Sequence, residues 1–175
     1  DLSLFLFIIS GYALMYNHED ELTTKEYYIR RFKGLFIPFY IAYTIMFLAY
    51  FAVNNVAAGS TSPLYTFVFT IIGVDAMVQE MSGGLGFYLI GEWFMSCIVF
   101  CYIFFPLFAK AVKKCKYVLL VVLALWSGFM LFVFNPFDMQ VEHNPLFVLL
   151  YFYVGILLYE LVGQKQISKN IRIIC

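Results

Sequence analysis

Long apolar runs separated by short polar connections dominate the sequence. A membrane-spanning helix needs roughly 20 apolar residues at about 1.5 Å of rise each. Runs close to this length occupy residues 35–53, 87–109, 117–134 and 146–163, and a slightly shorter run covers residues 2–16. A sixth run, residues 64–78, is short, follows Pro63 and is interrupted by Gly73 and Asp75. The pattern therefore predicts five spanning helices and one doubtful segment.

The positive charges decide how the doubtful segment is interpreted. Basic residues gather in three connections: Lys25, Arg30, Arg31 and Lys33; Lys110, Lys113, Lys114 and Lys116; and Lys165, Lys169 and Arg172. Loops rich in lysine and arginine stay on the cytoplasmic side. All three connections lie there only if residues 64–78 do not cross the membrane. We therefore predict an all-α, polytopic transmembrane helix bundle of about five spans, with one re-entrant or interfacial segment on the outer side, as a single membrane domain over residues 1–175.

Composition supports a membrane location and gives no indication of a nucleic-acid-binding protein or of a metal site. The chain is 63% hydrophobic and 13% charged, with a mean hydropathy of +0.86, whereas soluble domains are about 45–50% apolar. The net charge is zero, so nothing favours nucleic acid as a partner. Cys97 and Cys101 share a helical face, but no histidine or carboxylate joins them at ligand spacing. We interpret them as packing residues and predict no metal site.

The segment before the second apolar run carries a helix start signal. Thr23 followed by Glu26 fits a capping box, which predicts a cytoplasmic interfacial helix from Thr24 to about Gly34. Pro38 would then lie in the first turns of the next span, where a missing N–H is tolerated. In this arrangement the aromatic residues Tyr27, Tyr28 and Phe32 sit at the level of the lipid headgroups.

The basic residues of this segment have two interpretations. Arg30, Arg31 and Lys33 can anchor the topology and attract anionic lipid, each contributing about 1 kcal/mol. Alternatively they form a phosphate clamp, since the planar arginine fork matches phosphate oxygens. Charge alone favours the anchor.

Polar residues in or near the apolar runs are a second class of candidates, because charge is unfavourable in lipid. Asp1 precedes the first run, whereas Asp75 and Glu92 fall on the outer side, where they are either water-exposed or part of a site. Trp93 fits an aromatic belt. His143, in an outer loop, is either solvated or an acid–base group.

Four stretches resemble motifs of one membrane enzyme family. They are "DLSLFLFIISGYAL" with Asp1, Ser10, Gly11 and Tyr12; "YYIRRFKGLFIPFY"; "WFMSCIVFCYIFFP" with Trp93, Tyr102 and Pro106; and "YFYVGILLYEL" with Gly155. In this order they resemble membrane acyltransferase family 3, the O-acyltransferases that modify bacterial surface polysaccharides. The resemblance covers most of the chain.

The chain also departs from the family pattern. The second arginine of the loop motif falls near Gly34, and the paired glutamates of the tryptophan helix fall on Ile98 and Val99. The catalytic histidine of the family would lie in a span before Asp1, and later spans are absent as well. We therefore expect a piece of a longer protein, truncated at both ends and inactive alone.

The resemblance implies an activity and its participants. An acyl group, expected to be acetyl, would move from cytoplasmic acyl-CoA to a hydroxyl of a cell-surface polysaccharide or its lipid-linked precursor, in the bacterial inner membrane. Arg30, Arg31 and Lys33 would bind acyl-CoA. Asp1 and Ser10 would support catalysis, and Glu92 and Trp93 would face the acceptor sugar. No tightly bound cofactor is expected. The alternatives are a transporter or flippase of lipid-linked sugars and an inactive membrane scaffold of the same fold.

Overall fold

A computed structural model describes residues 2–17, 23–54, 63–81, 93–136 and 139–163. Within these ranges the chain is helical and contains no strand, which confirms the all-α prediction. The elements are α1 (Leu2–Tyr16), α2 (Thr24–Asn54), η1 (Leu64–Thr66), α3 (Phe67–Ile72), α4 (Asp75–Met81), α5 (Trp93–Phe132), η3 (Val141–His143), α6 (Pro145–Leu158) and a short π-helical turn, η4 (Tyr159–Gly163).

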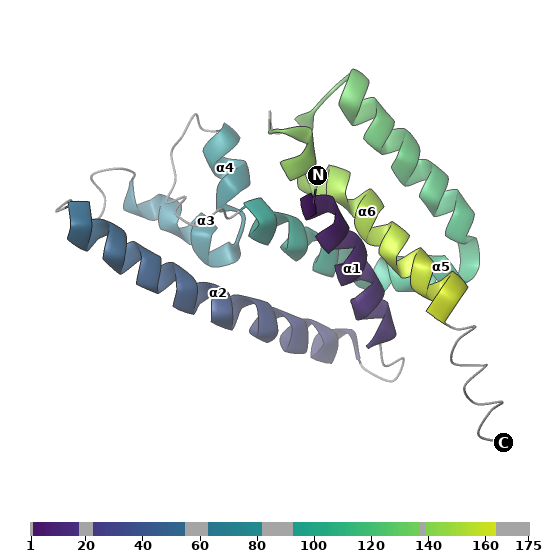
Figure 1. Cartoon of the computed structure of the whole chain (residues 1–175), viewed down its shortest axis with the longest axis horizontal. Helices are drawn as coiled ribbons and strands as arrows, with labels where there is room; N and C mark the ends of the chain where they lie inside the picture. The colour runs from purple at the N-terminus through teal and green to yellow at the C-terminus, as the bar shows by residue number, and fades with distance from the viewer. Residues whose placement is uncertain (1, 18–22, 55–62, 82–92, 137–138, 164–175) are drawn as a thin grey trace.

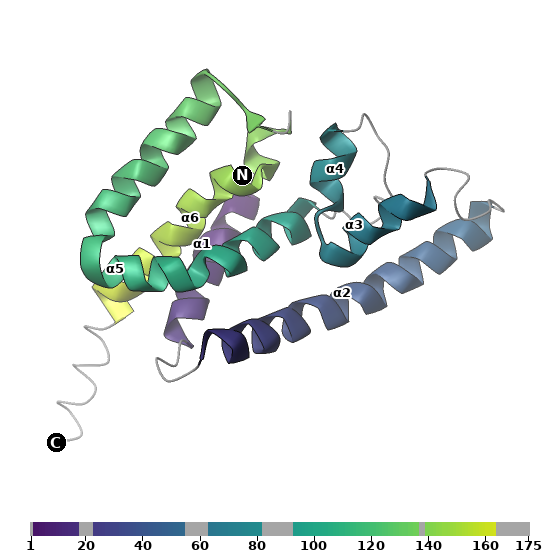
Figure 2. The ribbon, with the colours of Figure 1, turned by 180° about the vertical axis from the view of Figure 1, so that it is seen from behind.

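The longest helices coincide with the predicted spans. In the described part of the chain three helices are long and apolar enough to cross a membrane, namely Thr24–Tyr50, Trp93–Phe132 and Pro145–Val162, and α1 is a shorter apolar helix. The helix α5 is two helices joined at Cys115, whose backbone is non-helical (φ −142°, ψ 43°). Figure 2 shows these two arms as a V with its elbow near the α5 label. Each arm carries one predicted run, and the exact number of crossings stays a prediction.

The doubtful run at residues 64–78 forms no single spanning helix. It is divided into η1, α3 and the start of α4. Gly73 ends α3 with a left-handed backbone (φ 80°), and its N–H donates back to the last turn of that helix. A side chain there would be strained and would meet Met95 and Phe36 at 3.3 Å. The broken segment expected from Gly73 and Asp75 is therefore present, and its position on the outer side stays a prediction.

The helix α2 begins as predicted but continues further. The backbone N–H and hydroxyl of Thr23 both donate to Glu26, at 3.0 and 2.8 Å, and the Glu26 N–H donates to the Thr23 hydroxyl at 3.3 Å, which completes the capping box. The predicted break near Gly34 is wrong, because one helix runs from Thr24 to Asn54 with Pro38 inside it. Proline removes only one backbone hydrogen bond there, and its fixed φ is compatible with a helix.

The core lies where α1, α6 and the first arm of α5 meet (Figure 1). Its largest fully buried side chains include Phe7, Phe105, Phe152 and Tyr153. The Tyr153 hydroxyl donates to the carbonyl of Lys116 at 3.0 Å and so fastens the elbow of α5 to α6.

The contact between α1 and α6 depends on two glycines. A Cβ at Gly11 would overlap the Phe152 carbonyl oxygen, and a Cβ at Gly155 would overlap the Ile8 carbonyl oxygen. Such small residues allow helix backbones to approach closely in membranes. This contact fixes the register of α1, and therefore the position of Ser10, which precedes Gly11.

Candidate functional site

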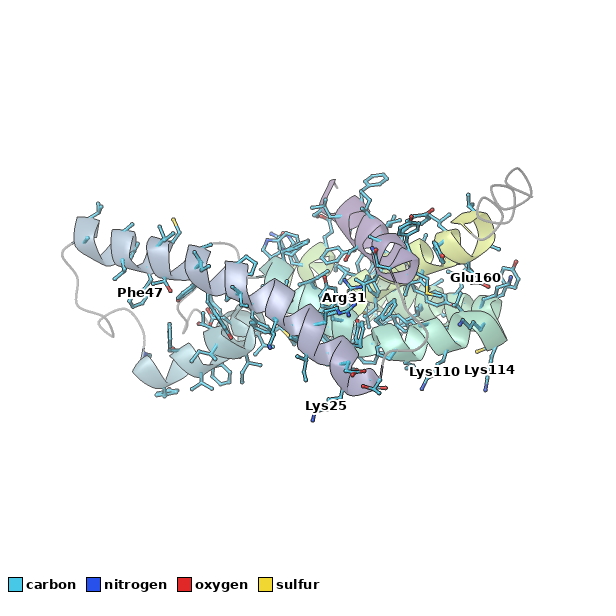
Figure 3. All side chains as sticks on the ribbon, turned by 90° about the horizontal axis from the view of Figure 1, so that it is seen from below. Lys25, Arg31, Phe47, Lys110, Lys114 and Glu160 are labelled. Carbon is cyan, nitrogen blue, oxygen red and sulfur yellow. The ribbon has the colours of Figure 1, made fainter. Side chains whose placement is uncertain are left out.

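The three basic residues predicted to act together on α2 divide into two environments. Arg31 is partly buried, whereas Arg30 and Lys33 are exposed. Figure 3 shows Arg31 directed toward the place where α1 and α5 meet α2, while Lys25, Lys110 and Lys114 project outward. The Arg31 guanidinium interacts electrostatically with the phenols of Tyr27 and Tyr102. Of the three predicted residues, Arg31 is therefore the one whose side chain is partly buried.

Tyr102 joins this arginine to α1. The Tyr102 hydroxyl lies within hydrogen-bonding reach of the Ser10 side chain. Ser10 is partly buried on α1, and Tyr102 is partly buried on the first arm of α5. The structure thus brings together two residues that the sequence predicted for separate roles, Ser10 for catalysis and Arg31 for acyl-CoA. We call Ser10, Arg31 and Tyr102 the three-helix site.

Two tyrosines fasten α2 beside this site. Tyr27 is buried, stacks on Phe105 with ring centroids 5.3 Å apart, and donates its hydroxyl to the Tyr102 carbonyl at 3.2 Å. Tyr28 donates to the Ile103 carbonyl at 2.9 Å. The Tyr27 ring is enclosed against α5, and its level relative to the lipid headgroups stays a prediction.

Pro106 explains why the Tyr102 carbonyl attracts a hydroxyl donor. Proline has no N–H, so the carbonyl four residues earlier, that of Tyr102, lacks its helical partner. In an apolar environment that oxygen needs another donor, and the Tyr27 hydroxyl supplies it. The sequence carried this signal in the spacing of Tyr102 and Pro106, which had been used only as part of a motif.

Trp93 lies at the start of α5 and has an unexpected neighbour. The imidazole of His143 stacks on its indole, with ring centroids 4.0 Å apart and an interplanar angle of 22°. Both residues are partly buried. One face of Trp93 is therefore covered, and His143 is neither isolated nor fully solvated. Asp1 and Glu92, also predicted for sites, lie outside the described residues.

Two asparagines hold the loop that carries His143. Asn144 is fully buried, donates to the side-chain oxygen of Asn135 at 2.9 Å and to the Pro136 carbonyl at 2.6 Å, and accepts from the Leu146 N–H as the N-cap of α6. Asn135 donates to the Met139 carbonyl. Neither asparagine was predicted as a functional residue, although an asparagine before a proline is a typical helix start.

Asp75 is fully buried at the first position of α4. The two residues after it, Ala76 and Met77, form a small core with Met139, and Trp93 packs against this core. The interpretation of Asp75 as a water-exposed interfacial carboxylate is therefore wrong. The fold of the broken segment turns its side chain inward near the Trp93 end of α5.

The cysteines are consistent with a packing role. Cys97 and Cys101 are buried and unpaired as thiols, and the Cys97 Sγ donates to the His143 carbonyl at 3.2 Å. Among the residues that the structure describes, no group of three or more histidine, cysteine or acidic side chains could hold a metal ion.

The first arm of α5 connects the two ends of the candidate site. Trp93 and Tyr102 are nine residues apart, which corresponds to ~14 Å along a helix. This distance is about half the thickness of a bilayer core. The three-helix site and Trp93 are therefore too far apart to bind one small group. Each is suited to contact a different part of a larger set of bound substrates.

Comparison with known proteins identifies the family. The family model of the acyltransferase domain Acyl_transf_3 matches residues 4–175. Searches of curated proteins and of solved structures gave no match. The match contains all four motifs that suggested the resemblance, apart from the first residues of the first motif. With its apolar helices and this match over nearly its whole length, the chain belongs to the acyltransferase family 3 of membrane proteins.

Proposed function

We propose that the protein is an integral membrane O-acyltransferase of the bacterial inner membrane. It would transfer an acyl group, acetyl in our expectation, from cytoplasmic acyl-CoA to a hydroxyl of a cell-surface polysaccharide or of its lipid-linked precursor. The observation that supports this most is the three-helix site, where Arg31 of α2, Tyr102 of α5 and Ser10 of α1 converge. The match to the family supports the reaction class.

Arg31 would bind a phosphate of the donor. Its charge lies partly buried among aromatic side chains, where an ionic interaction is stronger than in water. The guanidinium can bind phosphate oxygens in pairs. Arg30 and Lys33 are exposed on the same helix and would attract the remaining phosphates from solution. No further resident cofactor is part of this proposal.

Ser10 and Tyr102 would position the reacting acyl group. Both side chains carry hydroxyls that can donate to a thioester carbonyl. In the reaction the acceptor hydroxyl attacks the acyl carbonyl, a general base takes the hydroxyl proton, and the CoA thiolate leaves. By the family resemblance the base is a histidine expected before Asp1, and Asp1 would support it.

The acceptor sugar would bind toward the Trp93 end of α5, together with Glu92. Because His143 covers one face of the indole, a sugar ring can stack on the opposite face or replace the imidazole. Asn135 and Asn144 hold the loop of His143, so the covered face belongs to an ordered structure. The acceptor therefore meets an aromatic pair rather than an isolated tryptophan.

A transfer assay on membranes from cells expressing the full-length gene tests the proposal. Labelled acetyl-CoA is supplied and incorporation into envelope polysaccharide is measured. Arg31→Ala should raise the KM for acetyl-CoA about tenfold or more, because it removes a charge-assisted contact. Lys25→Ala, on the same helix but directed outward, is the matched control and should leave the KM unchanged.

Two results would contradict the proposal. Absence of any acyl transfer by the wild-type protein would favour a transporter or an inactive scaffold. A normal KM for Arg31→Ala, at normal membrane abundance, would remove Arg31 from the donor site while leaving the family assignment in place.

A further inference from the structure

A second site is formed where α3 lies along the C-terminal half of α2 (Figure 1). A cavity of about 280 Å³ opens between the two helices. Its lining residues are Tyr40, Tyr43, Thr44, Phe67, Thr70 and Ile71. Ligand pockets usually measure about 300–1,000 Å³, so the cavity is large enough for part of a ligand and much larger than a single water molecule.

The walls of the cavity are held by contacts between its own residues. The Phe67 ring packs against Tyr43, with ring centroids 5.9 Å apart. The Tyr40 hydroxyl donates to the Ile71 carbonyl, and the Thr44 hydroxyl donates to the Tyr40 carbonyl at 2.7 Å. These hydroxyls are therefore engaged in joining α2 to α3 or in the helix itself.

Thr70 differs from these residues. It is 2% exposed, and its hydroxyl has no hydrogen-bond partner among the described residues. Leaving a buried hydroxyl without a partner is unfavourable by about 1–3 kcal/mol. Because Thr70 belongs to the lining of the cavity, a ligand oxygen that enters beside it is a partner that would satisfy this hydroxyl.

The surroundings of the cavity define the class of ligand. The neighbouring positions on both helices are apolar and exposed: Ile41, Ile45, Val68 and Ile72 are 59%, 62%, 52% and 51% exposed. In a membrane protein such side chains face hydrocarbon, so a ligand reaches the cavity from the lipid phase. A sugar ring would bring several hydroxyls into a lining that is mostly aromatic and aliphatic, and most of them would lack partners.

The cavity is separate from the three-helix site. Arg31 and Tyr40 are nine residues apart on α2, which is about two and a half turns. The two side chains therefore leave opposite faces of the helix.

We propose that the cavity between α2 and α3 binds one acyl chain of a membrane phospholipid, with an ester carbonyl of that lipid accepting a hydrogen bond from Thr70. The chain fills the space between the aromatic walls and enters from the lipid-facing side of Ile41 and Val68. The bound lipid fastens α3 to α2. This site is independent of the acyl donor and of the transfer reaction.

Photolabelling tests the proposal on the protein reconstituted into phosphatidylcholine vesicles that contain a phospholipid with a diazirine on one acyl chain. After irradiation, adducts are mapped by mass spectrometry. Adducts should concentrate on Tyr43, Phe67 and Thr70. Thr70→Val keeps the shape of the side chain but removes the hydroxyl, and should lower this labelling about threefold to tenfold.

Three further variants separate the outcomes. Thr70→Ser retains the hydroxyl and should restore most of the labelling, whereas Thr70→Phe fills the cavity and should abolish it. Val118→Ala, on the exposed second arm of α5 and away from the cavity, is the control and should change nothing. Equal labelling of the cavity and of lipid-facing residues such as Val121 and Leu125 would show surrounding lipid only and overturn the proposal. Unchanged labelling of a folded Thr70→Phe protein would overturn it as well.

Discussion

The helices α6 and α2 are both long apolar helices, yet they are held in opposite ways. In α6, 50% of the apolar stretch is buried, whereas in α2 only 6% of it is buried. The helix α6 touches α1 backbone to backbone at Gly11 and Gly155. Among the residues that the structure describes, α2 meets the core through side chains between residues 27 and 39, and beyond them it packs against α3.

The difference shows how the three-helix site is built. Ser10 lies on the helix whose register is fixed by the glycine contact. Arg31 lies on the helix that is fastened by a few side-chain tips, chiefly the hydroxyls of Tyr27 and Tyr28. The catalytic side of the proposed site is therefore rigidly placed, and the donor-binding side depends on fewer contacts that can be changed one at a time.

The largest effect is expected at the glycine contact. Gly155→Ala places a methyl group into the Ile8 carbonyl, and because backbone cannot rotate away as a side chain can, α1 and α6 must separate. We expect a loss of about 3 kcal/mol or more of unfolding free energy. Thermal unfolding of the purified protein in detergent, followed by size-exclusion chromatography, measures it.

Gly128 on the second arm of α5 provides the matched control. A Cβ there has nothing within 4 Å, so Gly128→Ala should leave the melting temperature unchanged or raise it slightly. If Gly155→Ala and Gly128→Ala had the same effect on the melting temperature, α1 and α6 would not be in backbone contact. The contrast between α6 and α2 would then disappear.

A smaller effect is expected where α2 is fastened. Tyr27→Phe keeps the ring on Phe105 but removes the donor to the Tyr102 carbonyl. The loss should be about 1–2 kcal/mol, since the carbonyl freed by Pro106 is left without a partner. The same unfolding measurement detects it, and Tyr65→Phe, at a side chain that is 69% exposed, serves as a comparison outside this contact.

A double-mutant cycle identifies the cause of that loss. Pro106→Ala supplies an N–H four residues after Tyr102 and so gives its carbonyl an ordinary helical partner. In the Pro106→Ala background, Tyr27→Phe should have little effect on the free energy of unfolding. The difference between its effects in the two backgrounds is the coupling energy. The same loss with and without Pro106 would show that Pro106 does not create the acceptor for Tyr27.

The sequence predicts the helices well because apolar runs and lysine-rich connections are read directly from residue types. The elbow at Cys115 lies within "KAVKKCK", and the capping box lies at Thr23. The break expected near Gly34 fails because a glycine and a proline only permit a break, and the apolar face on either side of them continues without interruption.

The site was predictable only in part. The family resemblance named Ser10 and Arg31, but adjacent arginines have equal charge, and only packing against α5 separates Arg31 from Arg30. The stacking of His143 on Trp93 joins residues 50 positions apart, and the residue after His143 is held by a hydrogen bond from Asn144 to Asn135. The burial of Asp75 likewise follows from the fold of the broken segment.

The smallest expected effect concerns Gly34, which lies on α2 beside the three-helix site. A Cβ there has nothing within 4 Å, and alanine has the higher helix propensity, so Gly34→Ala should stabilise α2 by about 0.5–1 kcal/mol. The melting temperature in detergent should rise slightly, with an unchanged KM for acetyl-CoA, because a straight helix already places Arg31 inward. An increase in KM would instead show that donor binding requires α2 to bend at this glycine, so that the loosely held helix moves during the reaction.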